Sequence, residues 1–342
     1  MRLGRRGFLR AAVTTVGGMA ALRLWPFRFS SQPGAVPVMG APLRARVALV
    51  VATQKHREGV LRALRLLDPL RLHGRSVVLK PNLNSSHPFP GSTHVETLRT
   101  LIEVCRDAGA REITVADRSG MGETEQVMEE KGLKAMGREM GVRLVALDSL
   151  PSSAWRSRFG PGWHWVRGVL FPTLLEQADA IVQTCCLKTH RFGGQFTLSL
   201  KNTVGMVART GPDGYDYMRE LHSSPLQRVL IAELNTLYTP ALVVLDGIEA
   251  FVDGGPESGR LARPGVVLAG TDRVAIDAVG VALLRLHGAT GPVARGAIFQ
   301  QEQIRRAVEL GLGVASPAAI DLVTDSAEGQ AVIEAVRGEL AR

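Results

Sequence analysis

Cysteine is scarce in this chain, and its placement excludes several kinds of metal and redox site. The 342 residues include three cysteines, Cys105, Cys185 and Cys186. There is no CxxC pair and no ferredoxin-like run, so no iron–sulfur cluster is expected from this chain. Adjacent cysteines rarely bridge each other, because the small ring strains the peptide between them. A bridge from Cys105 to one of the pair stays open, but the sequence is typical of a domain that folds without disulfides.

Acidic residues are absent from residues 1–40, a segment that holds six of the net nine positive charges. The rest of the chain is therefore only mildly basic. A nucleic-acid-binding protein needs a basic face on its folded domain, so no nucleic-acid partner is expected. The segment also lacks a comfortable membrane span, because its apolar run over residues 11–22 is shorter than the ~20 residues that cross a bilayer.

The order of residues at the N-terminus resembles a twin-arginine export signal. Arg5-Arg6 is followed by Gly7, by Phe8-Leu9 and by the basic Arg10, and the apolar run comes next. We predict a signal over residues 1–28, a linker over 29–43 and one α/β domain over 44–342. The alternative is a chance basic terminus on a cytoplasmic protein.

The predicted signal sets the expected location and partners. The twin-arginine export machinery is an expected partner, and the domain is expected to be periplasmic or otherwise extracytoplasmic. Gly18-Met19-Ala20 and Val38-Met39-Gly40 are candidate cleavage sites. If neither is cut, the leader would tether the domain to a membrane. Many proteins that use this route take up a cofactor before export, which favours a bound metal or cofactor.

Short apolar runs alternate with amphipathic segments from residue 46 onward. Apolar runs predict strands, and apolar residues at helical spacing predict the helices between them. Buried strands that alternate with helices are typical of a mostly parallel sheet with helices on both faces, an α/β fold. The predicted strands are 47–52, 76–79, 113–116, 142–147, 180–184, 242–245, 266–269 and 321–324, and the predicted helices are 58–67, 94–108, 123–140 with a break near Gly132, 226–237, 274–286, 301–310 and 327–340.

Parallel sheets place ligands at the carboxyl ends of their strands, so polar residues directly after strands are the candidates for a site. Lys80 and Asn82 follow strand 76–79 and are predicted to bind a ligand, because a lysine at the end of a buried strand is costly unless it meets an anion or water. The alternative for Lys80 is a side chain that extends to solvent. Asp117 follows strand 113–116 and is predicted to be a general base or a metal ligand, with a turn or N-cap role as the alternative.

The residues before helix 94–108 are candidates for capping and for binding. Ser92 or Thr93 is predicted to be the N-cap, with Glu96 available for a capping box. A free helix N-terminus also suits an anion, so Thr93 is predicted to bind the ligand. His94 is predicted to be a metal ligand, the alternative being an ordinary first-turn residue. Asp246, after strand 242–245, is the second predicted metal ligand.

The densest group of polar residues follows strand 180–184. Lys188-Thr189-His190-Arg191 is followed by Gly193-Gly194 and then by Lys201-Asn202, a composition typical of an anion-binding loop. Apolar neighbours indicate that Lys201 is partly buried, which would lower its pKa and suit a nucleophile or base. The alternative is a solvated basic loop. We predict catalytic roles for Lys201, Asp117 and His190, and ligand binding by Lys188, Thr189 and Asn202.

As an ordered set, these motifs resemble the family called domain of unknown function 362, from about Val47 to Leu286. The resemblance rests on Lys80-Pro81-Asn82, Thr93-His94, Asp117, Leu187-Lys188-Thr189-His190, Leu200-Lys201-Asn202 with Gly205, Asp246-Gly247-Ile248, Gly254-Gly255-Pro256 and Ala269-Gly270-Thr271-Asp272 with Asp277. It implies a shared polar site and no particular reaction. Several relatives carry ferredoxin-type iron–sulfur modules, whose cysteines are missing from this chain.

One departure from the family pattern is the cysteine pair before Lys188. Relatives usually have a small uncharged residue and Pro at the positions of Cys185 and Cys186. A thiol beside a basic loop is a candidate nucleophile, and the alternative is a packed core residue.

The expected ligand is a small anion, a phosphate or carboxylate, neutralised by Lys80, Lys188 and Lys201. A divalent metal is a candidate cofactor beside it. The sequence leaves open whether the protein is an enzyme. The alternatives are a non-catalytic carrier or assembly protein for a cofactor or metal, and an accessory protein of an iron–sulfur redox system.

Overall fold

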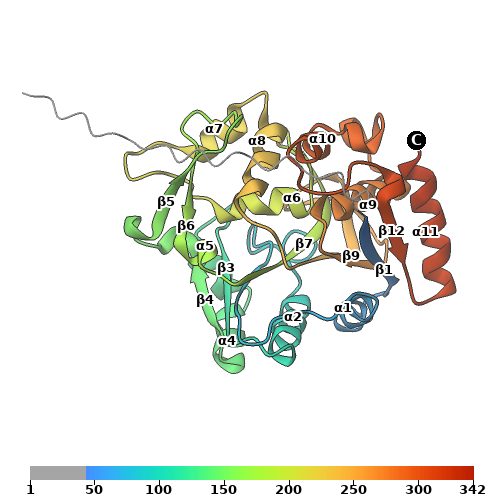
Figure 1. The fold of residues 1–342 in the computed structure, drawn as a ribbon, viewed down its shortest axis with the longest axis horizontal. Coiled ribbons are helices and arrows are strands. Elements are labelled where there is room, and N and C mark those ends of the chain that lie inside the picture. Colours follow the sequence, from blue (N-terminus) through green and yellow to red (C-terminus); the bar gives the residue numbers. More distant parts are fainter. Residues whose placement is uncertain (1–43) are drawn as a thin grey trace, which may run out of the picture. The chain divides into compact units, whose positions relative to one another are not determined.

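A ten-stranded sheet forms the centre of the domain in the computed structural model, which describes residues 44–342 (Figure 1). The predicted leader and linker, residues 1–43, lie outside the described residues. Across the sheet the strand order is β12 (Ile320–Val323), β1 (Ala45–Val51), β11 (Val266–Gly270), β9 (Leu242–Gly254), β7 (Ala180–His190), β2 (Ser76–Lys80), β3 (Glu112–Asp117) and β4 (Arg143–Ala146). Strand β10 (Gly259–Ala262) pairs with β9, and β8 (Gln195–Thr197) pairs with β7.

Most of the central strand pairs are parallel, which confirms the predicted fold class. Strands β9, β7, β2, β3 and β4 run in the same direction, and β1 is parallel to β12. Strand β11 is antiparallel to both of its neighbours. A separate two-stranded sheet is formed by β5 (Trp155–Arg158) and β6 (Val169–Pro172).

Helices cover both faces of the sheet, as Figure 1 shows. On one face lie α1 (His56–Arg65), α2 (Val95–Asp107), α3 (Thr124–Glu130) and α4 (Leu133–Met140); on the other lie α6 (Ser199–Asn202), α8 (Gln227–Leu234), α9 (Arg273–Leu286), α10 (Glu302–Glu309) and α11 (Ala327–Leu340). Alternate residues of β9 enter the two cores: Leu242 and Val244 pack under α1 and α2, whereas Val243 and Leu245 pack under α9. This is why the strand has a continuous apolar sequence.

The remaining helices are short. They are α5 (Thr173–Glu176) and α7 (Tyr217–Ser223), and single 3-10 turns connect several of the larger elements. The predicted break near Gly132 is confirmed, because Gly132 adopts a left-handed φ of 70° between α3 and α4. Within residues 44–342, no helix combines the length and the apolar character needed to cross a bilayer.

Strands β7 and β9 extend well beyond their predicted ends. The extension of β7 corrects the prediction of a loop at Lys188–Arg191. Strand β7 continues through His190, so Lys188, Thr189 and His190 are strand residues. Lys188 lies opposite Thr197 of β8 and Phe251 of β9, and its side chain is fully buried. The alternative of a solvated loop is therefore wrong. The prediction stopped too early because the apolar run ends before the strand does.

Candidate functional site

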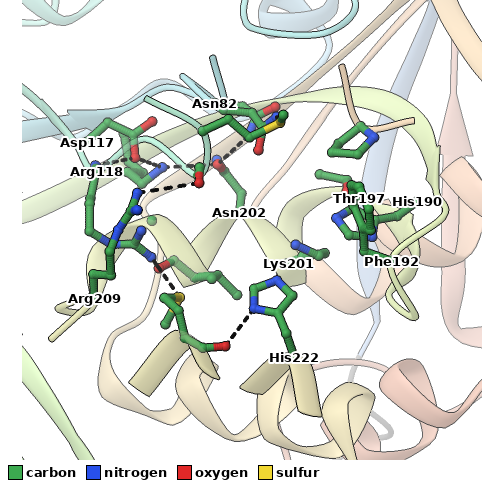
Figure 2. A pocket seen from close by; sticks show the side chains of 18 of the residues that line it. Asn82, Asp117, Arg118, His190, Phe192, Thr197, Lys201, Asn202, Arg209 and His222 are labelled. Carbon is green, nitrogen blue, oxygen red and sulfur yellow. Dashed lines mark hydrogen bonds and ion pairs between the residues drawn. The ribbon is translucent and has the colours of Figure 1, made fainter. Parts of the chain in front are cut away.

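A cavity of about 390 Å³ lies at the carboxyl ends of β2, β3 and β7, beside α6 (Figure 2). Lys80, Asp117 and His190 are the last residues of those three strands, and all three line the cavity. The parallel sheet thus brings together residues that are far apart in the sequence. The other polar lining residues are Asn82, Asn84, Arg118, Thr197, Lys201, Asn202, Arg209, Arg219 and His222.

One side of the cavity is built on a buried ion pair. Lys80 Nζ lies 2.6 Å from Asp117 Oδ1 and also donates to Pro81 O at 2.6 Å and to Asn202 Oδ1 at 3.0 Å. An ammonium group has three donors, so Lys80 has none left for a ligand. Asp117 in turn accepts from the backbone N–H groups of Leu83 and Arg118, each at 2.7 Å. Burial raises the pKa of Asp117 and lowers that of Lys80, while their mutual attraction opposes both shifts.

Gly205 packs directly against this ion pair. A Cβ at Gly205 would lie 2.9 Å from Lys80 Nζ and closer still to Asp117 Oδ1. The close approach of this backbone to two charged side chains therefore requires glycine.

Asp277 of α9 holds the N-terminus of the short helix α6 by hydrogen bonds. Asp277 accepts from Ser199 N at 2.8 Å and from Leu200 N at 3.1 Å, and burial raises its pKa to about 8. Asn202, at the end of α6, donates to Thr184 O at 3.0 Å and so is fixed to β7. These contacts place Lys201 and Asn202 at the cavity.

The opposite side of the cavity contains polar atoms that have no partner. His190 Nδ1 and Thr197 Oγ1 are buried there and accept or donate no hydrogen bond within residues 44–342, and the same holds for Asn82 Oδ1, which lies on the Lys80 side near Asn202. The amine of Lys201 likewise makes no hydrogen bond or ion pair with the described chain, and in Figure 2 no dashed line reaches it. Buried polar groups are normally satisfied, so such a cluster offers its hydrogen-bonding capacity to a polar ligand.

The electrostatics of this side follow from its burial and from its positive neighbours. Burial, with the nearby charges of Lys188 and Arg118, lowers the pKa of Lys201 to about 7. Burial and Lys201 hold the pKa of His190 well below its usual value, so its imidazole is neutral at pH 7. A Cβ on Gly194 would lie 2.9 Å from Lys201 Cε and 3.1 Å from His190 Nδ1, so these two side chains face the same small space.

Arginines complete the lining, and sequence reasoning gave none of them a role. The guanidinium of Arg118 is buried and donates to the carbonyls of Val207 and Val204, each at 2.7 Å, so it ties the wall together. Burial lowers its pKa to about 10. Arg209 makes longer contacts, 3.2 Å to Ser119 O, and Arg219 projects from α7. Thr197 and His222 were also missed, and nothing in their local sequence distinguishes them.

Three of the predicted ligand-binding residues do not line the cavity. Lys188 Nζ donates to Gly91 O at 2.5 Å, and burial lowers its pKa to about 8. Thr189 Oγ1 donates to Phe251 O at 3.2 Å, and Thr93 Oγ1 accepts from Asn82 N at 2.8 Å. Their side chains support the walls of the site.

The two predicted metal ligands, His94 and Asp246, lie in a separate cluster under α1 and α2. Asp246 Oδ2 lies 2.7 Å from His56 Nδ1 and accepts from Thr97 Oγ1 at 2.6 Å. His56 in turn stacks on His94, with 3.7 Å between ring centroids. The strand period explains the separation, because Asp246 points to the face opposite to that of Leu245. Residues 44–342 contain no group of three or more His, Cys, Asp or Glu side chains placed to share a metal ion.

The N-cap of α2 corrects another prediction. His94, rather than Ser92 or Thr93, is the N-cap, and its Nδ1 accepts from Glu96 N at 3.2 Å. Thr93 is unavailable because it holds the Asn82 backbone, and Ser92 donates to Ser85 O at 2.6 Å.

All three cysteines are free and buried. Burial raises the pKa of Cys105 to about 12 and that of Cys186 to about 11, and it raises the pKa of Cys185 well above its usual value. The thiols are therefore protonated at neutral pH, which favours packed core residues over nucleophiles.

The fold and the site define an α/β protein with a polar cavity at the carboxyl edge of its sheet. The chain belongs to the family described as domain of unknown function 362, whose model matches residues 77–282. That range includes every one of residues 44–342 that lines the cavity. The chain is also similar to a thylakoid-associated protein of Synechocystis sp., with 26% identity over 257 residues, which are 71% of this chain and 76% of that protein.

Proposed function

We propose that the cavity binds a small anionic molecule through a phosphate or carboxylate group. Its lining includes five lysine and arginine side chains and a single carboxylate, Asp117, which is already paired with Lys80. The observation that carries the proposal is the unpartnered amine of Lys201 among positive neighbours. A partly buried cation among other cations and without a counter-ion is unfavourable, and an anion in the cavity would offset that cost.

The other unpartnered groups define what else the ligand offers. Thr197 Oγ1 and the ring of His190 are able to donate to ligand oxygens, and Asn82 Oδ1 accepts from a ligand hydroxyl. Arg209 and Arg219 add positive charge to the lining and attract an anion from solution. In this proposal Lys201 binds the anion, and Lys80 and Asp117 position Asn202 and Asn82.

Thermal unfolding of the full chain tests this proposal. Inorganic phosphate and a panel of small carboxylates are added with and without Mg²⁺, Mn²⁺ or Zn²⁺. A ligand at 100 times its dissociation constant stabilises the protein by about 2.7 kcal/mol, which raises Tm measurably. We expect an anion-dependent shift that is lost in Lys201→Met and kept in Lys55→Met, a change at an exposed lysine outside the cavity. Equal shifts in both variants, or none with any anion, would overturn the proposal. A shift that needs the metal as well would assign a cofactor.

We further propose that the protein acts outside the cytoplasm after export in the folded state. The Arg5-Arg6 motif supports this location, and the similar Synechocystis protein is named for its association with thylakoids. Cell fractionation of the chain and of its Arg5→Lys/Arg6→Lys variant tests the proposal. Wild-type protein in the extracytoplasmic fraction and variant protein in the cytoplasm is the expected result. The same distribution for both chains would contradict it.

A further inference from the structure

Three lysines lie in or beside the site, and only one has a free amine within residues 44–342. Lys80 donates three hydrogen bonds, and Lys188 donates to the carbonyl of Gly91. Both are held as hydrogen-bond donors. Lys201 differs, because its amine ends in the cavity and has no acceptor in the described part of the chain. With cationic neighbours and no acceptor in the described chain, part of the Lys201 amine is uncharged at neutral pH, and the lone pair of that fraction is available for bonding.

The groups that face Lys201 suit a reaction at this amine. The charged groups that act on it are the cations Lys188 and Arg118, and no carboxylate of residues 44–342 stabilises its protonated form. His190 Nδ1 faces the same space and is buried without a partner among those residues. A neutral imidazole is able to accept a proton from one atom and return it to another.

We propose that Lys201 forms an imine with the carbonyl group of an anionic ligand, a 2-oxo carboxylate. This inference rests on the proposed anion site and names the chemical class of its ligand. The carboxylate satisfies the positive lining, and the adjacent carbonyl carbon is the electrophile. An amine that lines a cationic cavity beside His190, and that no carboxylate of residues 44–342 holds as an ammonium ion, is the arrangement that such a reaction needs.

The reaction exchanges one oxygen for one nitrogen and involves no oxidation. The lone pair of Lys201 Nζ attacks the carbonyl carbon, and the carbonyl electron pair moves to oxygen. His190 Nδ1 takes a proton from the nitrogen and returns it to the oxygen, giving a carbinolamine. The carbinolamine then loses water, and a C=N bond replaces the C=O bond. Amine and carbonyl are thus converted to imine and water, and hydrolysis reverses the step.

Reductive trapping tests the inference. The full chain is incubated at pH 7.5 with pyruvate, glyoxylate or 2-oxoglutarate, and sodium borohydride reduces any imine to a stable secondary amine. Intact mass and peptide mapping then locate the adduct. We expect labelling of Lys201 about a hundred-fold above that of the exposed Lys55, since a lowered pKa leaves far more of its amine uncharged. Lys201→Arg should abolish the adduct, and His190→Gln should slow its formation.

The same samples separate the two proposals. A thermal shift with phosphate or acetate but no adduct on Lys201 would overturn the imine and leave the anion site standing. Labelling spread evenly over surface lysines would also overturn it. The absence of both the thermal shift and the adduct would overturn both proposals.

Discussion

The two sides of the cavity contain similar kinds of side chain but differ in how completely those side chains are satisfied. Around Lys80 and Asp117 every donor of the ammonium group is used. Around Lys201 and His190 the polar atoms have no partner within the described chain. Lys80, Asp117 and His190 are all buried, so burial alone does not distinguish a supporting residue from a binding one. The two kinds of residue differ in whether their polar atoms already have hydrogen-bond partners in the described chain.

The largest expected effect on stability follows from removing the ion pair on the Lys80–Asp117 side of the cavity. Asp117→Ala leaves the ammonium of Lys80 buried without its counter-ion, so we expect the free energy of unfolding to fall by about 3–5 kcal/mol. Chemical denaturation measures the change. Glu139→Ala, which removes an exposed pair with Arg99, is the control and should leave the free energy of unfolding nearly unchanged. Similar losses in both variants would show that the Lys80–Asp117 pair does not support the site.

Removing the anchor of α6 should have a smaller effect on stability and a large one on binding. Asp277→Ala leaves the N–H groups of Ser199 and Leu200 without an acceptor, at a cost of about 1–3 kcal/mol. Because α6 positions Lys201, we also expect the anion-dependent thermal shift to be lost. Retention of the full shift in this variant would mean that Lys201 is placed by other contacts.

The side of the cavity around Lys201 predicts a change of protein stability with pH. The folded-state pKa of Lys201 is about 7 and its ordinary value is 10.5, so the unfolded chain binds one more proton between these values. Stability therefore rises with pH across this window, and the penalty of the buried cation is fully present below about pH 7. Relative to wild type, Lys201→Met should be more stable by about 1 kcal/mol or more at pH 6, and the difference should shrink towards pH 10. A pH-independent difference would contradict the assigned environment.

The smallest effect is expected at Gly194. Gly194→Ala places a methyl group against the end of the Lys201 side chain, which is flexible and able to move. We expect a change of less than about 1 kcal/mol in the free energy of unfolding but weaker anion binding, because Lys201 and His190 are pushed apart. Calorimetric titration of the variant and of Gly338→Ala, where the space is open, would separate the two effects. Unchanged affinity in Gly194→Ala would argue against a shared role for Lys201 and His190.

The sequence predicted the fold class and part of the site for identifiable reasons. Strand ends are visible as polar residues after apolar runs, so Lys80, Asp117 and Asn82 were correctly expected at one edge of the sheet. His190 was expected there as a loop residue and is in fact the last residue of β7.

The rest depends on contacts between distant segments. The partner of Asp246 is His56, which is 190 residues away in the chain. Whether a lysine is satisfied is equally invisible in a sequence, since Lys80, Lys188 and Lys201 stand in similar local contexts. Only the fold shows that two of them are held and that one is free within residues 44–342.

The binding of anions by Lys201 is tested most directly by calorimetric titration of the full chain with inorganic phosphate and with pyruvate, repeated with Lys201→Met. We predict saturable binding of at least one of these anions to the wild-type chain and no detectable binding to the variant. Binding of equal affinity to both chains would show that the unpartnered amine of Lys201 does not hold the ligand, and Lys201 would then have no binding role in the cavity.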